Sequence, residues 1–122
     1  MHKIRLLLFL GLLFLVGCTS AGGIITPADA KAMLDADEAI LIDVRTLEEF
    51  ETERIPGAIL VSLADIEAGK LSKMADKNET YIIYCRSGNR SAQAVQILKE
   101  EGYKHLYDLG GIINWPYETI SG

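Results

Sequence analysis

The chain has 122 residues, a length that fits a single domain, and its 12 basic and 17 acidic residues give a formal charge of −5. Removal of the first 17 residues would take away Lys3 and Arg5 and lower the charge to −7, from 10 basic and 17 acidic residues. A domain this acidic has no broad cationic surface, so the composition argues against nucleic acid and against electrostatic attraction to an anionic membrane. Any anion must be bound by a local arrangement of groups.

Residues 1–17 have the pattern of an export signal. A cationic start precedes an apolar segment, Leu6 to Val16, which at 11 residues is short of the roughly 20 that cross a bilayer as a helix. We therefore expect residues 1–17 to be a signal peptide and the protein to be extracytoplasmic. An ordinary cleaved signal peptide is one interpretation of this segment.

Residues 15–18 support a second interpretation, because they resemble a bacterial lipobox. Cys18 would then become a lipidated N-terminus, and residues 18–23 would be a flexible tether. Thr19 in place of Asp favours the outer membrane in a host with two membranes. We thus expect a periplasmic protein that is held at the membrane by its lipid alone.

From Ile24 onward, short apolar runs alternate with helical patterns, which predicts an α/β domain on a mostly parallel sheet. Thr26 and Pro27 are typical of a helix start, and Thr46 with Glu49 forms a capping-box pattern. Tyr81 to Tyr84 is the clearest strand pattern. In chain order we predict a helix at 27–35, a strand at 39–42, a helix after Thr46, a strand at 59–61, two helical pieces within 62–74, a strand at 81–84, a helix ending at Gly102 with Ala92, Val95, Ile97 and Leu98 inward, and a strand at 105–109.

Residues 85–91 carry the strongest chemical signal, because they lie between a buried strand and a helix start. Backbone N–H groups at a helix start are unpaired and point toward an anion, and Gly88 allows them to converge. We expect Cys85 to lie at the mouth of this nest as a thiolate, favoured by the helix N-terminus and by Arg86 and Arg90. A thiolate is a nucleophile, and the same groups would stabilise its persulfide. The two arginines match the oxygens of a dianion such as thiosulfate.

Other interpretations of these residues are structural. Cys85 alone would suggest a buried thiol, and Arg90 suits an ion pair supporting the loop about as well as a substrate contact. We interpret Asp43 and Arg45 as a structural clamp, with Arg45 paired to Glu49. The spacing of His, Cys, Asp and Glu predicts no metal site.

Five motifs, taken together and in order, resemble the rhodanese superfamily: residues 41–45, 49–50, 55–58, 84–91 and 110–115. The resemblance extends from Ile24 to Glu118 and implies a rhodanese-like three-layer α/β/α domain, residues 24–122, with a mostly parallel five-stranded sheet. It implies a sulfurtransferase that moves sulfane sulfur from thiosulfate or polysulfide to cyanide or a thiol through a Cys85 persulfide, with no cofactor. Arg86, Ser87, Gly88, Asn89 and Arg90 would bind the substrate.

The export signal makes the chain most similar to single-domain periplasmic rhodaneses of the phage-shock type, and the lipobox is a departure from them. Arg54 is another, because His commonly stands there. A non-catalytic persulfide carrier that serves a protein partner is an alternative function. Phosphatases and arsenate reductases with a related loop have Arg six residues after the cysteine, whereas here Arg90 stands at five, which makes their chemistry less favoured.

Overall fold

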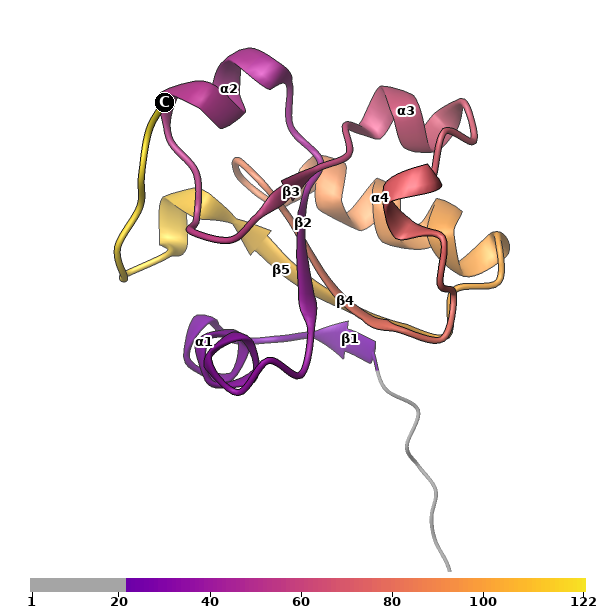
Figure 1. The fold of residues 1–122 in the computed structure, drawn as a ribbon, viewed down its shortest axis with the longest axis horizontal. Coiled ribbons are helices and arrows are strands. Elements are labelled where there is room, and N and C mark those ends of the chain that lie inside the picture. Colours follow the sequence, from indigo (N-terminus) through magenta and orange to yellow (C-terminus); the bar gives the residue numbers. More distant parts are fainter. Residues whose placement is uncertain (1–21) are drawn as a thin grey trace, which may run out of the picture.

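The computed structural model describes residues 22–122, so the expected signal peptide at 1–17 and the expected lipidation site at Cys18 lie outside the described residues. One five-stranded sheet forms the centre of the domain, in the order β1-β5-β4-β2-β3 (Figure 1). All pairs of neighbouring strands are parallel. The strands are β1 (Gly22–Ile24), β2 (Ile40–Asp43), β3 (Ile59–Leu60), β4 (Thr80–Cys85) and β5 (His105–Gly111).

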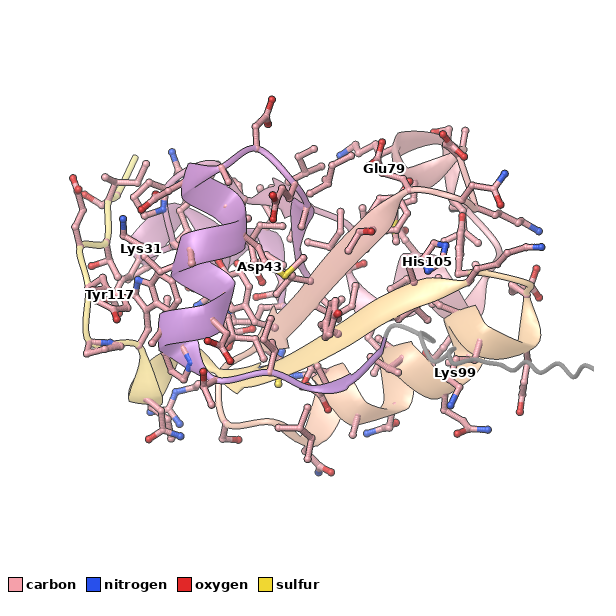
Figure 2. The ribbon with its side chains drawn as sticks, turned by 90° about the horizontal axis from the view of Figure 1, so that it is seen from below. Lys31, Asp43, Glu79, Lys99, His105 and Tyr117 are labelled. Carbon is pink, nitrogen blue, oxygen red and sulfur yellow. The ribbon has the colours of Figure 1, made fainter. Side chains whose placement is uncertain are left out.

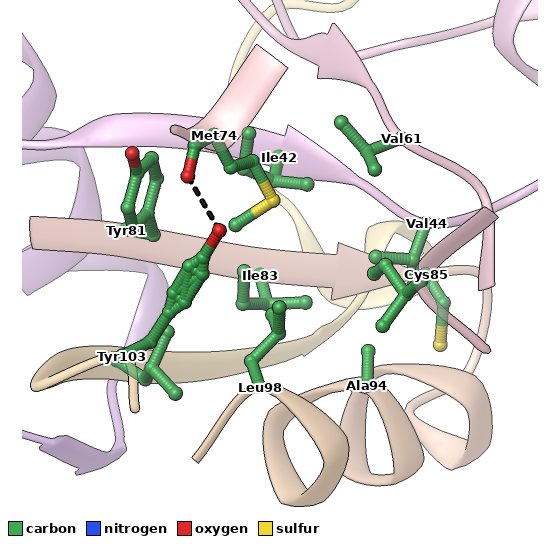
Figure 3. Packing of buried hydrophobic residues seen from close by; sticks show 12 residues of the cluster. Ile42, Val44, Val61, Met74, Tyr81, Ile83, Cys85, Ala94, Leu98 and Tyr103 are labelled. Atoms are coloured by element: carbon green, nitrogen blue, oxygen red, sulfur yellow. Dashed lines mark hydrogen bonds between the residues drawn. The ribbon is translucent and has the colours of Figure 1, made fainter. Parts of the chain in front are cut away.

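Helices cover both faces of the sheet, because side chains along the buried strand β4 alternate between two apolar clusters. Ile82 and Tyr84 pack under α1 (Pro27–Asp35). Tyr81, Ile83 and Cys85 pack on the opposite side, with α3 (Leu63–Glu67), the 3₁₀ turn η2 (Ser72–Met74) and α4 (Asn89–Glu100) (Figure 3). The expected three-layer α/β/α fold is therefore confirmed, and its sheet is entirely parallel.

The remaining helix, α2 (Leu47–Thr52), lies at the carboxyl ends of the strands (Figure 1). Its start has the predicted capping box: Thr46 Oγ1 accepts the Glu49 N–H at 3.2 Å, and Glu49 Oε1 accepts the Thr46 N–H at 3.0 Å. In an open parallel sheet, the carboxyl edge is where ligands bind. The helix α2 is thus placed beside the expected site.

Two local predictions were wrong. Gly22 and Gly23, expected in the tether, form the edge strand β1 with Ile24 and pair with β5 from Leu106 to Asp108. A strand of three residues, two of them glycines, has no alternating pattern, so only pairing with β5 defines it. Ala92 is exposed rather than inward, because the buried face of α4 is formed by Ser91, Ala94 and Leu98.

The C-terminal segment, residues 117–122, runs past α1 and then past the end of α2. Its Tyr117 lies against Lys31 of α1, with the ammonium 5.8 Å from the ring centre (Figure 2). Further on, Ile120 pairs with Arg54 through backbone hydrogen bonds of 2.8 and 2.9 Å, and the Arg54 guanidinium donates to the carbonyls of Phe50 and Gly122. Arg54 therefore has a structural role, anchoring the C-terminal segment to α2. Within residues 22–122, no helix combines the length and apolarity needed to cross a membrane.

Candidate active site

Cys85 is the last residue of β4, and the chain continues directly through a short loop into α4. Its side chain is on the α4 side of the sheet, near Val44 and Ala94 (Figure 3). Gly88 is the residue before the helix and has a φ of +111°, a backbone conformation that favours glycine. The predicted curl of the loop at Gly88 is confirmed, and it turns the following N–H groups back toward Cys85.

The Cys85 sulfur accepts two backbone hydrogen bonds from this loop. The Gly88 N–H donates to Sγ at 3.0 Å and the Ser91 N–H donates at 3.3 Å. Burial by itself raises the pKa of the thiol, but hydrogen bonds from Ser91, Gly88 and Ser87 outweigh burial, and the net pKa is lowered. The loop therefore favours the thiolate, as expected, although the main source is its hydrogen-bond donors rather than the arginines.

The thiol is more covered than the sequence suggested. Cys85 is 1% exposed, so it lies beneath the loop rather than at its mouth. The physical reason is that N–H groups close enough to bind Sγ also exclude solvent from it.

Ser91 is a site residue that the sequence analysis did not select. It is fully buried at the start of α4, its N–H contacts Sγ, and its hydroxyl donates to the Gly88 carbonyl at 3.0 Å. This second bond closes the loop on itself. A small hydroxyl residue six positions after the cysteine, in the first turn of the helix, was the available signal.

Arg90 is held in an ion pair. Its Nη1 and Nη2 donate to the two carboxylate oxygens of Glu49 at 2.8 and 3.0 Å. The hydrogen bond from Arg90 has the largest effect on the pKa of the Glu49 carboxyl. Together with hydrogen bonds from Thr46, it lowers this pKa to about 2. The capping residue of α2 thus also fixes the first turn of α4.

Our pairing of Arg45 with Glu49 is wrong, because Arg45 pairs with Asp43 instead. Its Nε donates to Asp43 Oδ1 at 3.0 Å and its Nη2 to Oδ2 at 2.7 Å. Both side chains are buried, at 0% and 4% exposure. The Arg45 Nη2 also donates to the Glu53 carbonyl at 2.6 Å, which ties β2 to the end of α2. The pair clamps two elements that border the site.

Gly111 is a second residue that the sequence did not mark as part of the site. A Cβ at this position would lie 2.3 Å from the Arg86 carbonyl oxygen and 2.6 Å from the Ser87 Cα. Two residues after Gly111, the Ile113 N–H donates to the Arg86 carbonyl at 3.2 Å. This hydrogen bond holds the loop against the glycine. Gly111 therefore permits the close approach of β5 to the active loop.

We expect Gly111→Ala to slow sulfur loading of Cys85 by about 100-fold, because displacing a reacting group by about 1 Å has an effect of this size. Its φ of −109° suits alanine, so the effect would come from the clash with the loop and not from backbone strain. Loading is measured by intact mass after thiosulfate exposure. Gly69→Ala is the control, since that glycine has a positive φ and open space around it; normal loading in both variants would contradict the prediction.

The remaining residues expected to bind substrate lie on the loop itself. Arg86, Ser87 and Asn89 are exposed. Arg86 borders a groove of about 330 Å³ between the loop, α2 and the 3₁₀ turn η3 (Ile112–Asn114). The described part of the chain holds no group of three or more His, Cys, Asp or Glu side chains arranged for a metal.

Comparison with known proteins agrees with this geometry. The sequence model of the family described as "Rhodanese-like domain" matches residues 26–117. The thiosulfate sulfurtransferase PspE of Escherichia coli K12 is 39% identical over 81 residues, which is 66% of this chain and 78% of PspE. YrkF of Bacillus subtilis, named as a candidate sulfur carrier protein, is 34% identical over 73% of this chain and 48% of its own length.

A solved structure described as a rhodanese with anions from E. coli superposes with a TM-score of 0.63 at 34% identity, over 69% of this chain and 99% of that one. The chain belongs to the rhodanese-like domain family. It is a rhodanese-like enzyme of the sulfurtransferase type.

Proposed function

We propose that the protein is a thiosulfate or polysulfide sulfurtransferase that works through a persulfide on Cys85. The observation that carries the proposal is the pair of N–H groups, from Gly88 and Ser91, on the Cys85 sulfur. The thiolate attacks the outer sulfur of thiosulfate, a new S–S bond forms, and sulfite leaves with the electron pair of the broken bond. Charge balances, because a thiolate and a dianion give a persulfide anion and a dianion.

The second half of the cycle returns the enzyme to the thiolate. The acceptor, cyanide or a thiolate, attacks the outer sulfur of the persulfide, and the electron pair of the S–S bond remains on Cys85 Sγ. The same two N–H groups then stabilise the leaving thiolate. Since the S–S bond adds about 2 Å to the side chain, the outer sulfur is the atom presented to the acceptor.

The loop residues divide into two roles in this proposal. Ser87, Gly88 and Asn89 supply the backbone curl and N–H groups over the sulfur, and Arg86 binds the oxygens of the donor. Arg90 acts through its ion pair with Glu49, which fixes the start of α4, so it positions the loop instead of contacting substrate. Asp43 and Arg45 support the same edge of the sheet from β2.

Sulfur loading tests the proposal directly. Intact mass after thiosulfate exposure is expected to show one added sulfur, removed by a reducing thiol and absent when the thiol has first been alkylated with iodoacetamide. The loading rate should fall as the pH drops through the lowered pKa of Cys85. Cys18→Ser is the matched control and should load normally. Loss of sulfur loading in this variant would refute the assignment of the persulfide to Cys85.

A persulfide carrier is the second candidate, favoured by the near-complete burial of Cys85 and by the similarity to YrkF. A carrier would load sulfur but turn over cyanide slowly, because only a protein partner would open the loop. Phosphatase chemistry is less supported, because Arg90 is engaged by Glu49 through two hydrogen bonds.

We also propose that the protein is extracytoplasmic and held at the membrane by a lipid on Cys18. The support is the sequence pattern of residues 1–18. We expect Cys18→Ala to move the protein from the membrane fraction to the soluble fraction after cell fractionation. Retention of this variant at the membrane would contradict the lipid anchor.

A further inference from the structure

The groove beside the active loop carries opposite charges that do not pair with each other. It is lined by Arg45, Glu48, Glu49, Thr52, Glu53, Arg86, Ile112 and Ile113. The ion pairs within 4.0 Å in the described part of the chain are Lys31–Asp35, Arg45–Asp43 and Arg90–Glu49. Arg45 and Glu49 are therefore neutralised by their partners, whereas Arg86, Glu48 and Glu53 have no ion-pair partner within residues 22–122.

The positive charge and the two negative charges lie on different walls of the groove. Arg86 is on the active loop, and Glu48 and Glu53 are on and just after α2. All three are exposed. The Glu53 carboxylate is oriented by the Thr119 hydroxyl, which donates to Oε2 at 2.9 Å. Opposite charges held apart across an open groove leave room for a molecule that carries both charges itself.

The groove borders the active loop, although Cys85 is not among its lining residues and its sulfur lies beneath the loop. Arg86 follows Cys85 in the chain through a trans peptide, so their Cα atoms are about 3.8 Å apart. The Arg86 carbonyl is fixed by the Ile113 N–H at 3.2 Å, which makes the loop one wall of the groove. A molecule bound at Arg86 reaches the outer sulfur of the persulfide, which is about 2 Å beyond Sγ, where that sulfur extends past the loop toward this groove.

We propose that this groove binds the sulfur acceptor and that the acceptor is a small thiol with both an ammonium and a carboxylate group, as in cysteine. The carboxylate pairs with Arg86 and the ammonium with Glu48 and Glu53. This inference rests on the proposed function, since it concerns the second half of the same cycle. Sulfite leaves after loading, so Arg86, which binds the donor oxygens in the first half of the cycle, is free to bind the acceptor carboxylate in the second.

The transfer step balances without another reactant. The acceptor thiol passes its proton to the outer sulfur of the Cys85 persulfide anion, and its thiolate attacks that sulfur and forms a new S–S bond. The old S–S bond breaks with its electron pair on Cys85 Sγ. The products are the acceptor persulfide, which keeps the proton, and the Cys85 thiolate.

Single-turnover sulfur transfer tests the groove separately from donor chemistry. The protein is loaded with thiosulfate and freed of donor, and loss of sulfur from Cys85 is followed by mass with four thiols. The thiols are cysteine, 3-mercaptopropionate, cysteamine and 2-mercaptoethanol, which carry both charges, only the carboxylate, only the ammonium, and neither. Each thiol is compared with itself between protein variants, so its intrinsic reactivity cancels.

In Glu48→Gln/Glu53→Gln we expect the rate constant for cysteine to fall about fivefold, as the loss of two exposed charge contacts implies. Cysteamine should fall similarly, while 3-mercaptopropionate and 2-mercaptoethanol should not fall. Glu51→Gln/Glu100→Gln is the matched control, because it removes the same charge from exposed positions outside the groove.

Two results would overturn the inference: equal changes for cysteine and 2-mercaptoethanol, or the same loss for cysteine in the control variant. Failure of the proposed function has a different signature. A wild-type protein that takes no sulfur from thiosulfate would fail before any acceptor is added. Thiosulfate loading of the Glu48→Gln/Glu53→Gln variant should be no slower than that of the wild type, because the substitutions remove only negative charge near the dianionic donor; such loading shows that its fold and active loop are intact.

Discussion

Replacing Cys85 with serine is expected to abolish sulfur loading and to reduce turnover of thiosulfate with cyanide by on the order of 10³-fold or more, as loss of a covalent nucleophile does. The loop lowers the pKa of the thiol through hydrogen bonds from Ser91, Gly88 and Ser87 that offset its burial. A serine hydroxyl has a far higher pKa, so the same donors leave it protonated. It is then too weak a nucleophile to attack thiosulfate.

The serine variant should remain folded, because its hydroxyl can accept the N–H groups of Gly88 and Ser91 that now contact Sγ. Thermal unfolding close to that of the wild type would separate loss of chemistry from loss of structure. The measurement is intact mass after thiosulfate exposure. Gain of one reducible sulfur by Cys85→Ser, as by the wild type, would remove Cys85 from the mechanism.

Replacing Asp43 with alanine is expected to lower the free energy of unfolding by about 3–5 kcal/mol, the cost of leaving one member of a buried ion pair without its partner. Asp43 accepts the side-chain bonds from Arg45 and also the Arg45 backbone N–H at 2.9 Å. Its removal would leave a guanidinium that is 4% exposed without a counter-charge. Denaturant unfolding, with the midpoint and slope compared to the wild type, measures the change.

Asp35→Ala provides the matched control for Asp43→Ala. Lys31 and Asp35 approach to 2.7 Å, the same distance as Arg45 and Asp43, but they lie on the exposed surface of α1. Water screens the exposed pair, so its loss should have a much smaller effect. Equal destabilisation by the two substitutions would show that burial does not determine the strength of the Asp43–Arg45 clamp. The double substitution Asp43→Leu/Arg45→Met should recover most of the loss, because it leaves no unpaired buried charge.

The sequence alone determined the elements whose signals are local. The helix start at Thr26 and Pro27, the capping box of Thr46 and Glu49, and the strand before Cys85 follow from hydrogen bonding and side-chain shape within a few residues. Gly88 and Cys85 were identified for the same reason, since a loop between a strand and a helix N-terminus has a chemistry of its own. The family resemblance rested on these residues and is confirmed by the comparisons.

Only the tertiary structure decided which charged groups pair and which atoms approach across the fold. Arg90 meets Glu49 across 41 positions, so local patterning could not show that Glu49 belongs to Arg90 and not to Arg45. Gly111 is important for the site because β5 passes within contact distance of the active loop. The strand β1 forms because Gly22 and Gly23 pair with the edge of β5. The burial of Cys85 likewise depends on how tightly residues 86–91 fold over it. Such pairings are set by the packing of distant segments, whose energies a local sequence window does not contain.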